Sequence, residues 1–185
     1  ITGWLAGRLG WRRLMIGTLI GFTIASIACG LSTNIESLLI SRTAQGLFGA
    51  PLTPLGQGML LATFAKRQHA LVLMLWGIGG TMGPVLGPIL GGVVGEALGW
   101  RWTYLFLAPI GVLAIIIAAF ALGDQQRGTS GRLGWTGFLS LAIAMGSAQL
   151  LLDRGHRLDW FESFEISAEL FICLIATLFF LGSTI

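Results

Sequence analysis

The distribution of charged residues constrains this chain more than any other feature of its sequence. Five stretches of at least 20 residues contain no Lys, Arg, Asp or Glu: 14–35, 43–65, 70–95, 102–123 and 133–152. A helix of about 20 apolar residues crosses a hydrocarbon core about 30 Å thick. Backbone polar groups cannot stay unpaired in lipid, so runs of this length must be helical. The sequence therefore predicts an all-α integral membrane protein with five full spans.

A sixth uncharged run, 170–185, is predicted as a truncated span because it ends with the chain. We expect the chain to be a fragment of a longer protein, since it opens at Ile1 without an initiator Met and stops at Ile185 inside this run.

The composition agrees with a membrane protein and disfavours other classes. Hydrophobic residues make up 55% of the chain and charged residues 10%, and the mean hydropathy is +0.84. Soluble domains carry about 25% charged residues. Basic loops explain the net charge of +3 better than a nucleic-acid partner does. Cys29 and Cys173 stand alone in apolar runs and are interpreted as packing residues.

The positive charges predict how the chain crosses the membrane. Seven of them fall in one set of alternate loops: Arg8, Arg12, Arg13, Lys66, Arg67, Arg127 and Arg132. The other set holds three: Arg101, Arg154 and Arg157. Cytoplasmic loops carry the Lys/Arg excess, so we place the first set inside. Within this scheme the polar, Gly-rich stretch 124–134 is a flexible cytoplasmic linker between a helical bundle, 1–123, and a pair of helices, 135–185.

A ladder of glycines marks the third full span. Glycine recurs at every fourth residue, at Gly79, Gly83, Gly87, Gly91 and Gly95, with Pro84 and Pro88 beside two of them. Bare backbone on one face of a helix lets another helix approach closely in lipid. Each proline removes a backbone donor and bends the helix. The pattern favours a specialised contact surface, with ordinary small-residue packing as the alternative.

Arg42 is the only charge clearly within a predicted span. An Arg at the centre of a membrane helix costs about 2.5–3.5 kcal/mol and usually faces a cavity or a partner. Arg42 also lies about 9 Å along the helix from Glu36, so its side chain could instead extend to the outer interface. This span has three further polar groups, Gln45, Thr53 and Gln57. Two interpretations of these side chains stay open: they line a substrate path, or they form hydrogen bonds to neighbouring helices.

Three ordered motifs resemble those of the major facilitator superfamily. GWLAGRLGWRR (Gly3–Arg13) resembles the loop motif between its second and third helices, RTAQGLFGA (Arg42–Ala50) its fourth-helix motif, and GGTMGPVLGPILGG (Gly79–Gly92) the antiporter motif of its fifth helix. WRWTYLFLAPIG (Trp100–Gly111) and QLLLDRGHRLDWF (Gln149–Phe161) are similar to the fourteen-span drug:proton antiporter branch of EmrB-type exporters. Gly7 and Gly134 stand where that pattern often has an acid.

This resemblance implies the fold and the site. The chain would hold the end of helix two through helix six of the N-terminal bundle, followed by two additional linking helices. The implied gating residues are Gly3, Leu5, Arg8, Gly10, Arg12 and Arg13. The implied proton-relay and cavity residues are Arg42, Gln45 and Gly46, with Arg42 opposite a carboxylate of the first helix. The implied antiporter-motif residues are Gly79, Gly83, Pro84, Gly87, Pro88, Gly91 and Gly92.

The implied function is export of drugs or other small hydrophobic compounds across the inner membrane in exchange for protons. The proton gradient would supply the energy, so no cofactor and no enzymatic activity are expected; the sequence has neither metal-ligand spacing nor a phosphate-binding G-x-x-x-x-G-K-[ST] motif. The expected partners are the lipid bilayer, a periplasmic membrane-fusion adaptor and an outer-membrane channel. An exporter of another solute, such as a siderophore or a tetracycline-like compound, and a non-transporting structural membrane protein are the alternatives.

Overall fold

The computed structural model describes residues 2–123, 134–155 and 164–184, and in these ranges it contains helices and their connections without strands. The chain forms two compact units, Thr2–Ser130 and Gly131–Ile185, each described here by itself. Five helical segments of the described residues are long and apolar enough to span a membrane: Trp11–Leu31, Lys66–Leu98, Trp100–Ala121, Trp135–Gly155 and Phe164–Gly182. The all-α membrane fold predicted from the sequence is therefore confirmed.

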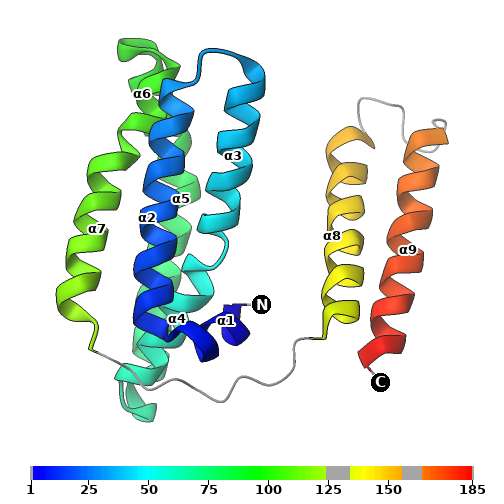
Figure 1. The fold of residues 1–185 in the computed structure, drawn as a ribbon, viewed down its shortest axis with the longest axis horizontal. Helices are drawn as coiled ribbons and strands as arrows, with labels where there is room; N and C mark the ends of the chain where they lie inside the picture. Colours follow the sequence, from blue (N-terminus) through cyan, green and yellow to red (C-terminus); the bar gives the residue numbers. More distant parts are fainter. Residues whose placement is uncertain (1, 124–133, 156–163, 185) are drawn as a thin grey trace. The chain divides into compact units, whose positions relative to one another are not determined.

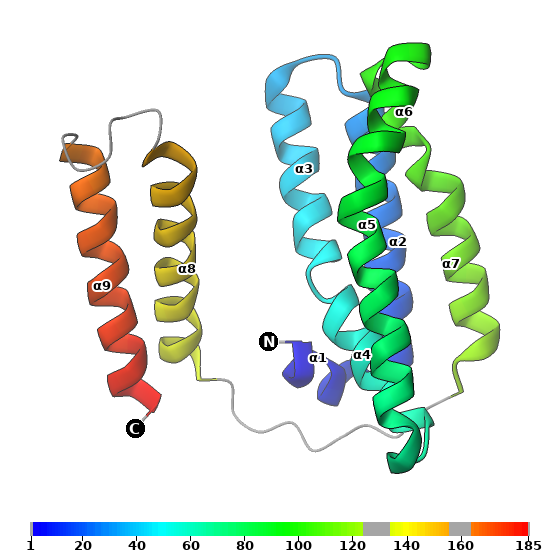
Figure 2. The same cartoon turned by 180° about the vertical axis from the view of Figure 1, so that it is seen from behind.

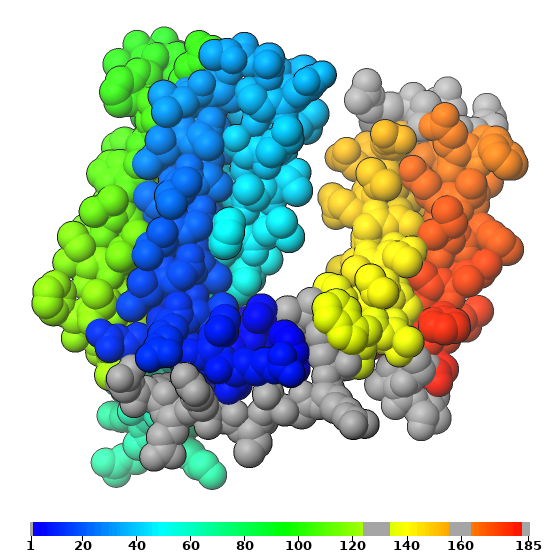
Figure 3. Space-filling view, viewed as in Figure 1, coloured from blue at the N-terminus to red at the C-terminus, as the bar shows by residue number. Residues whose placement is uncertain are grey.

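The chain of the first unit passes repeatedly between the two ends of the unit (Figure 1). In chain order they are α1 (Thr2–Leu9), α2 (Trp11–Leu31), α3 (Ile35–Gly49), α4 (Leu52–Thr63), the 3₁₀ turn η1 (Lys66–Gln68), α5 (His69–Leu98), α6 (Trp100–Leu105) and α7 (Leu107–Ala121). Helix α2 is central, because α3, α4, α6 and α7 all pack against it. Helix α5 packs instead on α6 and α4, on the side seen in Figure 2. The side chains of α2, α3 and α7 close over the opposite face (Figure 3).

Two glycines allow the central helix to meet its neighbours closely. A Cβ atom built on Gly111 of α7 would collide with the side chain of Thr23, and one built on Gly30 of α2 would lie 2.6 Å from Cγ of Leu105. Thr23 cannot easily move away, because its hydroxyl donates to the Leu19 carbonyl at 2.7 Å. Bare backbone thus does occur at helix crossings in this protein, although at positions that the glycine ladder of the sequence does not include.

Two arginines tie α2 to the helices beside it at opposite ends of the unit. At the start of α2, Nη2 of Arg12 donates to the Ala119 carbonyl at 2.9 Å, close to the end of α7. Beyond the other end of α2, Nη2 of Arg101 donates to the Ser32 carbonyl at 3.2 Å. The last four carbonyls of a helix have no partner within it, and positive charge is favourable there. Each arginine therefore stabilises the C-terminal end of an antiparallel neighbour.

The stretch 43–65 was expected to form one span, and in the structure it consists of two helical segments joined by Ala50 and Pro51, which both keep αR backbone angles. The helix ends at Gly49 and begins again at Leu52, giving α3 and α4. Pro51 and Pro54 each lack an N–H, and a proline ring clashes with the carbonyl four residues earlier. Two missing donors within four residues explain the break. In the same way the predicted span 102–123 divides at Phe106 into α6 and α7, three residues before Pro109.

Helix α5 behaves differently from these two segments. It continues from His69 to Leu98 as one helix through Pro84 and Pro88. Its neighbour α6 begins directly after Gly99, where φ is +90° and ψ is 154°, a conformation that only glycine adopts without strain. A glycine at this point lets the chain reverse its direction between the two helices.

The second unit contains an antiparallel pair, α8 (Trp135–Gly155) and α9 (Phe164–Thr184). Small side chains of α8 are buried in it: Ser140, Ala144 and Ser147. Sγ of Cys173 donates to the Ala144 carbonyl at 3.4 Å, and both cysteines of the chain are free. Most of the predicted linker, 124–133, lies outside the described residues.

The last helix begins before the uncharged run 170–185. Helix α9 begins at Phe164 and includes Glu165 and Glu169. Glu169 is compatible with the helix because its carboxylate lies 3.8 Å from Nη1 of Arg154 on α8. Charged residues near the end of a membrane helix thus belong to the helix when they have a partner beside them.

We predict that Gly111→Ala destabilises the protein by about 1–3 kcal/mol, the usual cost of forcing an extra methyl into a packed contact. The measurement is the thermal unfolding of the full-length protein in detergent. Gly17→Ala is the matched control, since Gly17 lies within α2 with nothing within 4 Å of its built Cβ. An unfolding temperature unchanged by Gly111→Ala would show that the α2–α7 crossing is not tight.

Candidate functional site

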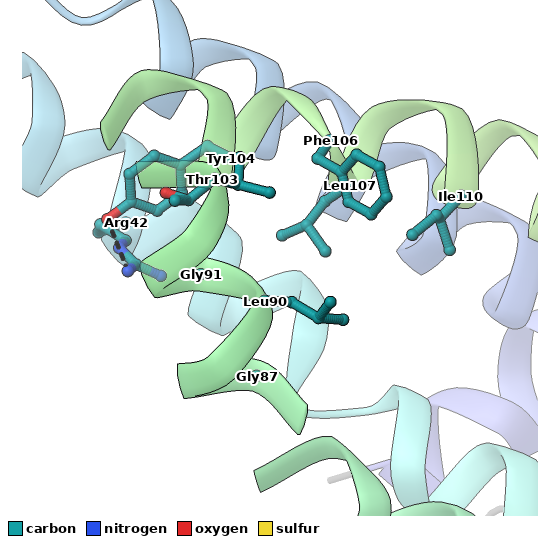
Figure 4. A pocket seen from close by; sticks show the side chains of 10 residues that line it. Arg42, Gly87, Leu90, Gly91, Thr103, Tyr104, Phe106, Leu107 and Ile110 are labelled. Atoms are coloured by element: carbon teal, nitrogen blue, oxygen red, sulfur yellow. Dashed lines mark hydrogen bonds between the residues drawn. The ribbon is translucent and has the colours of Figure 1, made fainter. Parts of the chain in front are cut away.

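Arg42 of α3 is turned toward α6 and held there by two neutral side chains. Its Nη1 donates to Oε1 of Gln45 at 2.8 Å, and its Nη2 donates to the hydroxyl oxygen of Tyr104 at 2.8 Å. The guanidinium carbon also lies 4.4 Å from the centre of the Tyr104 ring, within the range of a cation–π contact. Figure 4 shows this pair at one end of a pocket. Arg42 therefore lines a pocket in this structure.

The polar contacts continue from Arg42 into the buried centre of the unit. Gln45 is 5% exposed, and its Nε2 donates to the hydroxyl of Ser26 on α2 at 2.8 Å. Ser26 is fully buried and donates to the Phe22 carbonyl at 2.8 Å. Buried polar groups are costly unless they are bonded, and here each one is. The result is a continuous network across α6, α3 and α2.

A pocket of about 350 Å³ lies beside the Arg42–Tyr104 pair. Its walls come from α5, α6 and α7 (Figure 4), and they are lined by Gly87, Leu90, Gly91, Val94, Thr103, Phe106, Leu107 and Ile110. Most of these side chains are apolar, so the guanidinium and the tyrosine hydroxyl form its polar end. Ligand sites commonly combine an apolar lining with a few converging polar groups.

The glycine ladder of α5 has open space around most of its length. No atom of the described residues lies within 4 Å of a Cβ built on Gly79, Gly83, Gly87 or Gly91, and the same holds for Gly80 and Gly92. Near the end of the ladder, a Cβ on Gly95 would lie 3.7 Å from Thr103. The close helix contact expected for this ladder is thus not made by the described part of the chain, because no helix of the first unit covers that face of α5. The structure instead brings Gly87 and Gly91 to the pocket beside Arg42.

The loop-motif residues do not gather into one cluster. Gly10 links α1 to α2 with φ +87° and ψ 144°, so a glycine is required at that position. The guanidinium of Arg8 stacks 4.3 Å from the Trp4 ring centre, whereas Arg12 binds α7 and Arg13 is exposed.

The remaining predicted residues have simpler surroundings. Leu5 packs against a small core formed by Ala6, Leu14 and Leu55. Gly3 and Gly46 have open space around a built Cβ, and Thr53 and Gln57 are exposed. Of the three polar residues Gln45, Thr53 and Gln57, Gln45 is therefore the one with a hydrogen bond to a neighbouring helix.

Sequence reasoning missed two members of the polar network, Tyr104 and Ser26. Tyr104 is the one tyrosine of the chain and follows Trp100 by one helical turn, which was a usable signal. Ser26 carried no such signal, because serines are common in membrane helices and bond to their own backbone. Among the described residues, no three His, Cys, Asp or Glu side chains lie together as a metal-binding group.

The comparison with known proteins agrees with this architecture. The model of the Major Facilitator Superfamily matches residues 1–185. Multidrug export protein EmrB of Escherichia coli strain K12 is 37% identical over 180 residues, which are 97% of this chain and 35% of that protein. Fatty acid resistance protein FarB of Neisseria gonorrhoeae is 35% identical over 167 residues, 90% of this chain and 33% of that protein. Multidrug resistance protein B homolog of Mycobacterium tuberculosis strain H37Rv is 37% identical over 145 residues, 78% of this chain and 27% of that protein.

The helices and the family match together define a segment of a multi-pass helical protein of the inner membrane. The chain belongs to the Major Facilitator Superfamily. It spans about a third of the length of the relatives it matches.

We predict that Gln45→Leu lowers the stability of the protein by about 1–3 kcal/mol, because it removes the buried acceptor of Arg42 and the donor to Ser26. Thermal unfolding of the full-length protein in detergent measures the effect. Gln57→Leu is the matched control, since Gln57 is an exposed glutamine of the adjoining helix. Equal unfolding temperatures for the two variants would contradict the network as a stabilising feature.

Proposed function

We propose that the whole protein exports small hydrophobic compounds, drugs among them, across the inner membrane in exchange for protons. The observation that carries the proposal is the placement of Arg42 at the polar end of an apolar pocket whose opposite wall is the glycine face of α5. An apolar pocket suits hydrophobic compounds, and a charge at membrane depth is typical of proton and substrate pathways.

The guanidinium of Arg42 is suited to a role in proton coupling. A guanidinium has five N–H donors, and the hydrogen bonds to Gln45 and Tyr104 use two of them. No carboxylate of the described residues forms an ion pair with Arg42. The counter-charge in this proposal is a carboxylate on a helix outside this chain. Positive charge nearby stabilises the ionised form of such an acid, so movement of either group would bind or release a proton.

The glycine face of α5 supplies the moving contact in this mechanism. Alternating access in this fold comes from two helical bundles that rock against each other around a central site. A face without side chains, from Gly79 to Gly92, offers the second bundle a smooth surface for close approach. The loop-motif residues, with Arg8, Arg12 and Arg13 at the same end of the unit, would act at the cytoplasmic gate.

The names of the relatives support export, and they do so for two kinds of compound. Two of the relatives are multidrug proteins and one confers fatty acid resistance. Exporters of another solute share the same site, so substrate assays must separate them from a drug exporter. A periplasmic membrane-fusion adaptor and an outer-membrane channel belong to the proposal through the family resemblance alone.

The first test is efflux of a fluorescent dye from cells that express the full-length protein. We expect efflux to stop when a proton uncoupler is added. We expect Arg42→Ala to reduce efflux at least about tenfold and to change its pH dependence, because removing a partner of a charge pair costs several kcal/mol. Efflux by Arg42→Ala with the rate and pH profile of the wild type would rule out the role of Arg42, and uncoupler-insensitive efflux would rule out proton exchange.

A second test addresses the glycine face. Gly83→Leu should abolish efflux while leaving the amount of protein in the membrane unchanged, because a bulky side chain would hold the bundles apart. Gly77→Leu is the matched control, since Gly77 lies on the same helix about 200° around its axis from Gly79 and has the same open space around a built Cβ. Normal efflux by Gly83→Leu would end the interface hypothesis.

A further inference from the structure

The side chain of Arg42 can adopt many rotamers, so the residues around it determine where the guanidinium lies. An arginine side chain loses rotamer entropy when it is fixed in one position. Arg42 is on an exposed side of α3, and Gln45 holds it from the same helix, three residues away. A contact within one helix limits the rotamers of the side chain, but it does not choose which neighbouring helix the guanidinium faces.

Tyr104 supplies the contact that makes this choice. It comes from α6, 62 residues away in the sequence, and it holds the guanidinium in two ways. Its hydroxyl oxygen accepts a hydrogen bond from Nη2 at 2.8 Å, and its ring lies under the guanidinium at 4.4 Å. The hydrogen bond fixes the direction in which Nη2 points, and the ring contact fixes the plane of the guanidinium. Tyr104 therefore restrains both the position and the orientation of the charge.

Tyr104 is itself held in place. The ring of Trp100 meets it edge to face, with the ring centres 6.1 Å apart and the planes at 83°. The residue next to Trp100, Arg101, bonds to the Ser32 carbonyl beyond the end of α2. Helix α6 is thus tied to the central helix close to the point where Tyr104 contacts Arg42.

We infer that Tyr104 is the positioning residue for Arg42, and that it keeps the guanidinium at the pocket wall rather than at the outer interface. The inference rests on the proposed function for its consequence in transport, but the placement itself is separate. Because the Tyr104 oxygen accepts from Arg42, its own O–H is available to donate, and no described residue accepts from it. The polar end of the pocket is therefore a pair of donors, not an isolated arginine.

The placement is tested without transport, through the reactivity of Arg42. Purified full-length protein is treated with phenylglyoxal, which modifies accessible guanidinium groups, and the modification of Arg42 is followed by mass spectrometry. Tyr104→Phe keeps the ring and removes the hydrogen bond, so Arg42 should react at least about fivefold faster, as expected for the loss of a hydrogen bond to a charged group. Tyr104→Leu, which removes both contacts, should react faster still.

Thr43→Val is the matched control for this experiment. It removes a hydroxyl beside Arg42 whose hydrogen bond goes to the Leu39 carbonyl of its own helix. Its Arg42 should react at the wild-type rate. Wild-type reactivity of Arg42 in Tyr104→Phe and in Tyr104→Leu would overturn the inference.

A double-mutant cycle in dye efflux tests the consequence for transport. The four proteins are the wild type, Tyr104→Phe, Arg42→Ala and the double variant, measured over a range of pH. If Tyr104 acts through Arg42, Tyr104→Phe changes the pH profile of efflux in the wild type and has no further effect when Arg42 is absent. Additive effects in the double variant, or a wild-type pH profile in Tyr104→Phe, would contradict positioning. If the wild type shows no proton-driven efflux, the proposed function fails, and the phenylglyoxal result still decides where Tyr104 holds Arg42.

Discussion

Hydrogen bonding in a medium without water governs the organisation of the first unit. Each helix end and each polar side chain within the bilayer must find its partner in the protein, and the partners come from neighbouring helices. Arg12 donates a hydrogen bond to a carbonyl near the end of α7, and Arg101 donates one to a carbonyl just beyond the end of α2. The same requirement joins Arg42 and Gln45 of α3 to Ser26 of α2. The polar groups that cost most to bury thus become the contacts that specify which helices lie together.

Glycines serve two different purposes in this chain. At Gly30 and Gly111 a neighbouring side chain of the same unit occupies the space that a Cβ would need. These two glycines therefore determine how closely α2, α6 and α7 pack. Along α5 the missing side chains leave an open face. The packed and the open glycines have the same composition, and their surroundings alone distinguish them. In the proposed mechanism the open face and the charge at Arg42 act together, because the pocket joins them.

Much of the fold was predicted from the spacing of the charged residues, and the features that this prediction missed have clear physical causes. Long uncharged runs located the membrane segments because the bilayer imposes a length on them. The interruption within the run 43–65 was not predicted because the same argument ignores Pro51 and Pro54, which interrupt the helix without adding charge. Helix α9 begins before the last uncharged run and includes Glu169, whose charge Arg154 on the adjacent helix compensates. Only part of the site could be predicted from the sequence. Arg42 and Gln45 stood out as polar groups in an apolar span, but Tyr104 is separated from them by 62 residues and shares no periodicity with them.

The sequence by itself determined that the chain is helical, that it crosses a membrane several times, and which residue types carry charge at membrane depth. These properties depend on local composition measured against the thickness of a bilayer, and no knowledge of neighbours is needed. The tertiary structure decided which way Arg42 faces, which glycines are packed and which are open, and which carbonyls the arginines bind. Those outcomes depend on contacts between segments far apart in the chain, and one-dimensional spacing does not contain that information.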